Sequence, residues 1–400
     1  MAREVWITGI GLASSLGEGL DAHWAAVAEA VPPKPNVDLA FTPPFGIHPI
    51  VPLDLDKQVP KREQRQMEPW QRLGTYAAGL ALSDAGIAGN LDILSRTHVV
   101  AAADGGERDV ATDTAILAGL QTTDTPASFL NERLSNDLRP TLFLAQLPNL
   151  LAGNISIVHK VTGSSRTFMG EEIAGVSATE IAWRRIGAGQ GDIFLVGGAC
   201  SAERKDSVLN CALGGILWAG EYQPVWERLE KGGGAMLGSA GAFLVLEARE
   251  HAEARGRKPY AKLLDVQTDQ SRRRPGDVAA KLSRQFDAIA PKGSGTVSVL
   301  SAATGIAQAT QEEHDLLAAL IASGRVDRVR GMASLLGTTT SATFPAVAGL
   351  AALSLARKRF YQPLDATGFE APSTDAADRI AVTIAGTWRG EGSALLAAVE

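Results

Sequence analysis

Cysteine, histidine and long apolar runs are scarce in this chain, and each scarcity excludes a class of protein. The two cysteines, Cys200 and Cys211, cannot build a disulfide framework, so the sequence predicts a reducing compartment, the cytoplasm. Their spacing and that of the six histidines match no metal-binding motif, so no metal is expected. The chain has no apolar run of about 18 residues or more, which predicts no membrane span.

The chain also has no excess of basic residues over acidic ones. The chain has 38 lysine and arginine residues against 44 aspartate and glutamate residues, which gives a net charge of −6. Nonspecific binding to nucleic acid or to a membrane surface needs a basic face, so neither partner is expected. With 400 residues, 45% of them hydrophobic and 20% charged, the composition is that of a soluble globular protein with a large core.

Residues 161–200 predict one α/β unit, on which the rest of the interpretation depends. A short β-like run at 165–169 follows a Gly-Ser turn, and apolar residues then recur at helical spacing from Ile173 to Ile186. A glycine-rich loop at 187–191 ends the helix, and an apolar strand follows. In many α/β enzymes the N-terminus of such a helix holds a nucleophile, because backbone N–H groups and the helix dipole favour a negative charge there.

The segment from Gly163 to Gly198 resembles the β-ketoacyl-acyl-carrier-protein synthases, the condensing enzymes of fatty acid and polyketide synthesis (FabF-like members of the thiolase superfamily). Their pattern runs from a Gly-Pro-Ser turn through a Thr-Ala-Cys elbow to a strand ending in Gly-Gly-Ala. The resemblance is strongest at residues 3–17, 61–86, 140–198 and 223–262. The early glycines also suggest a dinucleotide-binding motif, but the third glycine of that motif is missing, and no cofactor is expected.

The resemblance implies an α/β protein with the duplicated thiolase-like fold, in five layers ordered αβαβα. The N-terminal half is expected over residues 1–255, with an irregular, proline-rich excursion at 32–60, and the C-terminal half over residues 256–400. The strands and turns of the first half recur in the second, and we expect the two halves to form one compact unit.

The catalytic residues of the family are missing at the matching positions. Counted without gaps, the nucleophilic cysteine of the family falls on Glu172, and its first histidine falls on Ala303. Counting back from Pro363, with an uncertainty of one residue, places the second histidine on Thr339 and the supporting lysine on Ser334. The resemblance therefore implies a degenerate site without the cysteine–histidine–histidine triad.

The loop that closes the site in the family has also changed. Its Gly-Phe-Gly-Gly-Thr-Asn pattern has become residues 387–392, with Trp388 and Arg389 at the gating position. Cys200 and Cys211 are expected to be small buried hydrophobic residues rather than replacement nucleophiles. The arginine run at 272–274 is interpreted either as a docking site for an acidic partner or as a solvated loop, and the solvated loop is the commoner case.

Two segments resemble contact surfaces of the family. Arg62 and Arg65 precede a helix at the position where the family docks acyl carrier protein, although an ordinary solvated helix start explains them equally well. The apolar segment at 140–157 matches a stretch that lies at the dimer interface and near the acyl tunnel, and a buried core helix is the alternative. The residues expected at that interface are Leu142, Phe143, Leu144 and Leu147.

Taken together, the changes favour a catalytically silent homologue that pairs with an active ketosynthase subunit, as chain-length factors do, and contacts acyl carrier protein. The pathway would be type II fatty acid synthesis, very-long-chain products included, or polyketide synthesis. Two alternatives stay open. One is an active condensing enzyme with a rearranged site, and the other is a divergent lyase or hydrolase that uses Glu172.

Overall fold

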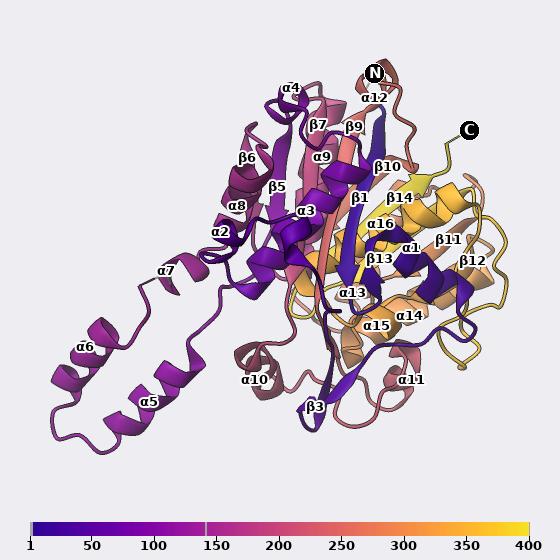
Figure 1. Ribbon diagram of the computed structural model, residues 1–400. Helices are drawn as coiled ribbons and strands as arrows, with labels where there is room; N and C mark the ends of the chain where they lie inside the picture. The colour runs from indigo at the N-terminus through magenta and orange to yellow at the C-terminus, as the bar shows by residue number, and fades with distance from the viewer. Residues whose placement is uncertain (1–2, 141, 400) are drawn as a thin grey trace.

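The computed structural model describes residues 3–140 and 142–399 of the chain (Figure 1). Within that part, an 11-stranded mixed sheet has the order β12-β11-β13-β14-β10-β1-β9-β7-β5-β6, with the short strand β2 beside β1. The strands are β1 (Val5–Ser14), β2 (Gly17–Glu18), β5 (His98–Ala102), β6 (Ser165–Phe168), β7 (Ile193–Cys200), β9 (Ala240–Ala248), β10 (Ala261–Asp269), β11 (Val297–Ser301), β12 (Val326–Gly331), β13 (Arg379–Ala385) and β14 (Glu391–Ala397).

The strand order is the same on both sides of the central β1–β10 pair, in which Ile7 lies opposite Ala261. Outward from the centre, the first half runs β1-β9-β7-β5-β6 and the second runs β10-β14-β13-β11-β12. In each half the two inner pairings are antiparallel and the two outer pairings are parallel. The predicted duplication is therefore confirmed. The expected division at 255/256 lies between β9 and β10, and we keep it as a proposal.

Helices complete the five predicted layers. In the middle, α9 (Glu172–Gly187) and α16 (Thr343–Arg357) pack against each other, and each contacts strands of both halves. Outside the first half lie α3 (Pro69–Asp84) and α8 (Leu150–His159), and outside the second lie α13 (Asp277–Ile289) and α14 (Ala307–Ala322). Residues 343–355 of α16 are all buried, which an apolar, alanine-rich helix tolerates because it is enclosed on every side.

Short elements fill the connections between these layers. The remaining α-helices are α1 (Gly19–Trp24), α2 (Lys61–Gln64), α4 (Leu91–Leu94), α5 (Val110–Leu120), α6 (Pro126–Asn136), α7 (Leu142–Ala145), α10 (Lys205–Leu213), α11 (Val225–Glu230), α12 (Arg249–Ala254) and α15 (Ala333–Leu336). The short turns of other helix types are η1 (Ala25–Glu29), η2 (Leu55–Lys57) and η3 (Thr340–Ala342). None of the helices in the described part of the chain is both long and apolar enough to cross a membrane.

The excursion at 32–60 has more structure than its proline content suggests. A small second sheet forms there from β3 (Asp38–Thr42), β4 (Phe45–His48) and β8 (Leu237–Gly238). β4 pairs in parallel with β8, far along the chain, so a long-range contact orders a segment that lacks local periodicity.

A helical arm leaves the body between β5 and α8. Its helices α5 and α6 pack against each other and project away from the large sheet (Figure 1). Ile116 in α5 is buried, whereas Val110, Leu117 and Leu134 are exposed. The arm thus presents apolar side chains that the rest of this chain does not cover.

The tight contact between β1 and α3 gives the first prediction. A Cβ built at Gly11 would lie 2.0 Å from the carbonyl oxygen of Ala77, a distance that the backbone does not allow. We expect Gly11→Ala to lower the free energy of unfolding by about 3 kcal/mol, as overpacking does. Gly153→Ala in α8 is the control, because its nearest neighbour would be 3.9 Å away. It should be neutral or stabilising. Equal denaturation midpoints for the two variants would contradict this packing.

Candidate functional site

A cavity of about 620 Å³ opens at the N-terminus of α9. Its walls come from the end of β5, the turn into α9, the end of β7, α10 and the loop at 387–389. Both halves of the fold contribute, since that loop joins β13 to β14. A concave site of this size with a few polar groups is where ligands generally bind.

The turn that delivers Glu172 to this cavity is sharply bent. Gly170 has a φ of +136° and Glu171 a φ of +54°, a left-handed value that is uncommon for a residue with a side chain. The helix α9 begins at Glu172, whose side chain is 0% exposed. The turn therefore places this side chain in the wall of the cavity and not on the surface.

The carboxylate of Glu172 points towards the loop between β13 and β14. Thr387 donates its backbone N–H over 3.0 Å and its hydroxyl over 2.5 Å to the two carboxylate oxygens. The backbone N–H of Glu172 is a further donor. The sequence predicts a cap on the first-turn amides of α9, but the main partner is Thr387, which lies 215 residues further along the chain.

Burial raises the pKa of the Glu172 carboxyl, because the charged form loses its hydration. The hydrogen bonds from Thr387 and from the N–H of Glu172 oppose that rise, and the nearby Asp104 carboxyl adds to it. On balance, the pKa of the Glu172 carboxyl is raised above its ordinary value in spite of these donors.

Asp104 is a site residue that the sequence analysis did not single out. It follows β5, lines the cavity and accepts a hydrogen bond from the Ser341 hydroxyl over 3.1 Å and another from the Thr340 hydroxyl. Burial raises the pKa of its carboxyl. The signal was its position directly after a buried strand, where α/β sheets place functional groups.

The other degenerate positions do not meet at the cavity. Ala303 packs in an apolar core with Val299 and Trp226. The N–H of Thr339 donates to the Thr343 hydroxyl over 3.0 Å, although its neighbours Thr338 and Thr340 line the cavity. The hydroxyl of Ser334 accepts the N–H of Val225 over 3.0 Å. Among the described residues that line the cavity, none is a histidine or a lysine.

Trp388 and Arg389, expected at the gating position, both line the cavity. Trp388 is half exposed and lies against Gly214, just beyond α10. Arg389 forms an ion pair with Glu171, with 3.2 Å between Nε and Oε2. The loop thus contacts both glutamates at the start of α9.

The two cysteines also line the cavity, each of them partly exposed rather than fully buried. Burial nevertheless raises the pKa of Cys200 to about 12 and the pKa of Cys211 to about 11. Both are therefore thiols at neutral pH, and a thiol is a poor nucleophile compared with a thiolate.

The residues expected at contact surfaces lie further out. Arg62 in α2 and Arg65 directly after it are exposed, and Arg62 forms an ion pair with Glu63 over 2.8 Å. In and after α7, Leu142 is buried and Phe143 is 67% exposed. Leu144 and Leu147 are half buried. Pro148 separates α7 from α8, so the segment is two helices rather than a single core helix.

Residues 51–252 match the family model of the β-ketoacyl synthase N-terminal domain. A 3-oxoacyl-[acyl-carrier-protein] synthase 2 of Rhizobium meliloti is 27% identical over 284 residues, which cover 66% of this chain and 63% of that protein. The chain thus matches somewhat less than two thirds of the length of this relative.

Two solved structures align over the whole of both chains. A β-ketoacyl synthase from Burkholderia phymatum has a TM-score of 0.80 at 18% identity, and the ishigamide ketosynthase/chain length factor has a TM-score of 0.78 at 18% identity. At such low identities, these two similarities show the fold alone. The family model spans about half of the sequence, and the chain belongs to the β-ketoacyl synthase family.

Proposed function

We propose that this chain is a catalytically silent ketosynthase homologue that pairs with an active β-ketoacyl synthase, as a chain-length factor does. The observation that carries the proposal is the position of Glu172. Its buried carboxyl group lies at the N-terminus of α9 and accepts hydrogen bonds from the N–H and the hydroxyl of Thr387. Donors arranged in this way would otherwise stabilise an oxyanion on a substrate.

Condensation needs groups that this cavity does not offer. A thiolate must hold the acyl chain, and donors or imidazoles must stabilise the enolate. The two thiols in the cavity keep their protons, and Ala303, Thr339 and Ser334 offer neither an imidazole nor an ammonium group.

Exposed apolar surface supports a partner chain. Phe143 is 67% exposed, Met169 59% and Leu213 78%, and all three lie near the cavity or the arm. Among the described strands, β6 lies at the edge of the sheet and pairs on one side only, with β5, so its other side can pair with a second sheet edge. We propose that the arm and Leu142, Phe143, Leu144 and Leu147 contact an active ketosynthase in the cytoplasm, and that the pair elongates fatty acid or polyketide chains.

One observation favours a second candidate, a lyase or hydrolase. A buried carboxyl with a raised pKa at the end of a cavity suits a general acid. We rank it second because Thr387 occupies both of its oxygens.

The proposed function is tested by co-expression with an intact ketosynthase. We expect a one-to-one complex, whereas the chain alone should neither accept an acyl group nor decarboxylate malonyl carrier protein. In the complex, Glu172→Ala should leave most of the rate of product formation intact. Phe143→Asp should prevent assembly, and Leu91→Asp, at an equally exposed leucine in α4, should not. A loss of about a hundredfold in Glu172→Ala, about 2.7 kcal/mol, with the complex intact would make Glu172 catalytic instead.

If the carboxyl group of Glu172 only fills space inside the fold, its ionisation should destabilise the folded state. Because its pKa is raised in the folded state, the stability that it contributes is complete below its unfolded pKa and is lost as pH rises through the folded value. Glu172→Gln cannot ionise, so its melting temperature should rise relative to that of the wild type as pH increases above about 4, the ordinary range of a glutamate carboxyl. Glu132→Gln, which removes the same charge from an exposed side chain of α6, is the control. A difference in melting temperature that does not change with pH would argue against this role of Glu172.

We also propose that Arg62 and Arg65 dock the acidic carrier protein. Exposed ion pairs contribute about 0–1 kcal/mol each and weaken with salt. The double variant Arg62→Glu/Arg65→Glu should therefore weaken carrier-protein binding by the complex roughly tenfold at low salt, as measured by calorimetry. Arg96→Glu/Arg284→Glu reverses the same charge elsewhere on the surface and should not. Equal affinities for the two variants would mean that the partner subunit alone provides the docking face.

A further inference from the structure

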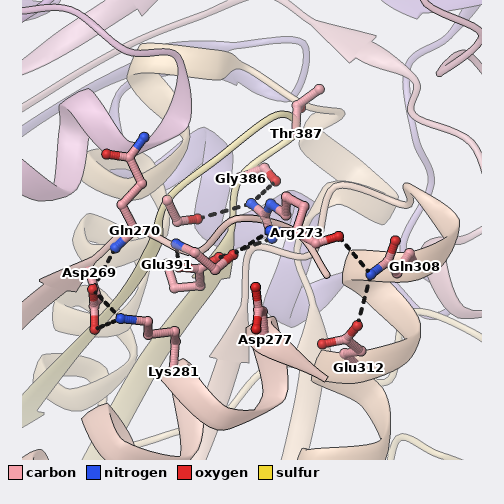
Figure 2. Close-up of polar contacts among 12 residues, drawn as sticks. Asp269, Gln270, Arg273, Asp277, Lys281, Gln308, Glu312, Gly386, Thr387 and Glu391 are labelled. Atoms are coloured by element: carbon pink, nitrogen blue, oxygen red, sulfur yellow. Dashed lines mark hydrogen bonds and ion pairs between the residues drawn. The ribbon is translucent and has the colours of Figure 1, made fainter. Parts of the chain in front are cut away.

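Arg273 has an unusual position for the middle residue of an arginine run. Arg272 and Arg274 are exposed, whereas the side chain of Arg273 is only 18% exposed and turns inward (Figure 2). Neither sequence interpretation of this run, a solvated loop or a docking site, describes that residue. An arginine that gives up hydration must gain contacts of comparable strength in return.

Those contacts lie in the loop that follows β13. One terminal nitrogen of Arg273, Nη2, donates to the carbonyl oxygen of Gly386 over 2.5 Å and lies 3.2 Å from that of Gly390. The other, Nη1, is 3.1 Å from a carboxylate oxygen of Glu391. Figure 2 shows the guanidinium of Arg273 between Gly386 and Glu391, with Thr387 directly next to Gly386. The forked guanidinium reaches the two carbonyls through one nitrogen and Glu391 through the other, which the single nitrogen of an ammonium cannot do at the same time.

The backbone at Arg273 is held in place to make this possible. Its φ is +58°, a left-handed conformation that a long side chain adopts only when its surroundings impose it. The N–H of Arg273 donates to the Ser271 hydroxyl over 3.3 Å, and Gln308 donates to its carbonyl oxygen over 3.3 Å. Ser271 in turn donates its N–H and its hydroxyl to Glu391, which closes a ring of contacts around the loop.

The loop is closed by a hydrogen bond of its own and contacts the first turn of α9. The N–H of Gly386 donates to the Gly390 carbonyl over 2.9 Å, so the carbonyls that Arg273 holds belong to one closed turn. That turn presents Thr387 to Glu172. A Cβ at Gly390 would lie 2.5 Å from Ile173, so the loop also packs directly on the first turn of the helix.

From this geometry we propose that Arg273 is a positioning residue that locks the 386–390 loop against α9. The loop stands at the family's gating position, and here it stays shut with Thr387 over Glu172 and closes the inner end of the cavity. This inference deepens the proposed silent role and rests on it, because a subunit that does no chemistry has no need to open its site.

The positive charge of Arg273 also helps to hold the loop in place. Glu172, Glu313 and Glu391 are all buried, and Arg273 is the cation that faces them, with Glu312 nearby. Burial lowers the pKa of the Arg273 guanidinium, while these four carboxylates act in the opposite direction. Removal of Arg273 would therefore leave Glu391 without its cation and the loop without the hydrogen bonds to its carbonyls.

The test is hydrogen exchange of the full-length protein, followed by mass spectrometry on peptides that cover residues 385–392. In Arg273→Ala we expect the amides of this loop to exchange at least tenfold faster than in the wild type, an opening cost reduced by about 1.4 kcal/mol. Arg272→Ala removes the same charge from the next, exposed residue, and its loop should exchange like the wild type. Loop rates that are the same in the two variants would overturn the lock.

Two further variants distinguish the loss of specific contacts between Arg273 and the loop from a general loss of stability. Arg273→Lys keeps the positive charge but has a single nitrogen, which cannot contact the two carbonyls and Glu391 at once, so its loop should open faster while α16 exchanges as before. Arg273→Ala/Glu391→Gln removes the unpaired carboxylate, and its loop should still open faster. Protection restored by that second change would show that the carbonyl contacts do not hold the loop. Wild-type loop rates in Arg273→Lys would also overturn the proposal.

The same samples distinguish the lock from the proposed function. Assembly with the active ketosynthase is measured by size-exclusion chromatography for each variant. If no complex forms with the wild type but Arg273→Ala still loosens the loop, the silent-partner function fails and the lock stands. If the complex forms and the loop is indifferent to Arg273, the lock fails and the function stands.

Discussion

A carboxyl group buried at the end of a central helix must be given hydrogen-bond donors, and the region around Glu172 is arranged to meet that requirement. Thr387 provides two donors, and the N–H of Glu172 provides a third. The loop that holds Thr387 is in turn fastened by Arg273 and packed on Ile173 through Gly390. Without these supports, the side chain would be an unsatisfied buried polar group, which costs about 1–3 kcal/mol or more.

The site depends on both halves of the duplicated fold. The β13–β14 loop reaches Glu172 from the second half, and the matching β7–β9 connection of the first half lines the same cavity through Cys211. The two central helices make this possible, because α9 and α16 each contact strands of both halves. The internal symmetry of the fold thus brings two equivalent connections to the same cavity.

The sequence was sufficient for the fold and for the start of α9. Apolar spacing from Ile173 to Ile186 and the family patterns gave the layers and the place of Glu172. It was not sufficient for contacts between distant segments. Nothing local at Glu172 points to Thr387, and a run of three arginines has the composition of a solvated loop although Arg273 turns inward. The β3–β4 hairpin was missed for the same reason, since its order comes from β8.

The choice of glutamate at position 172 has a physical explanation within the proposed silent role. A small residue there would leave a void beside Thr387 and leave the N–H of Thr387 without its partner. A cysteine would fit the space and restore a reactive thiol, because a helix N-terminus lowers the pKa of a thiol. Glutamate fills the space, uses the donors and offers no thiol for acyl transfer. The fold can then persist for assembly while its central position carries no condensation chemistry.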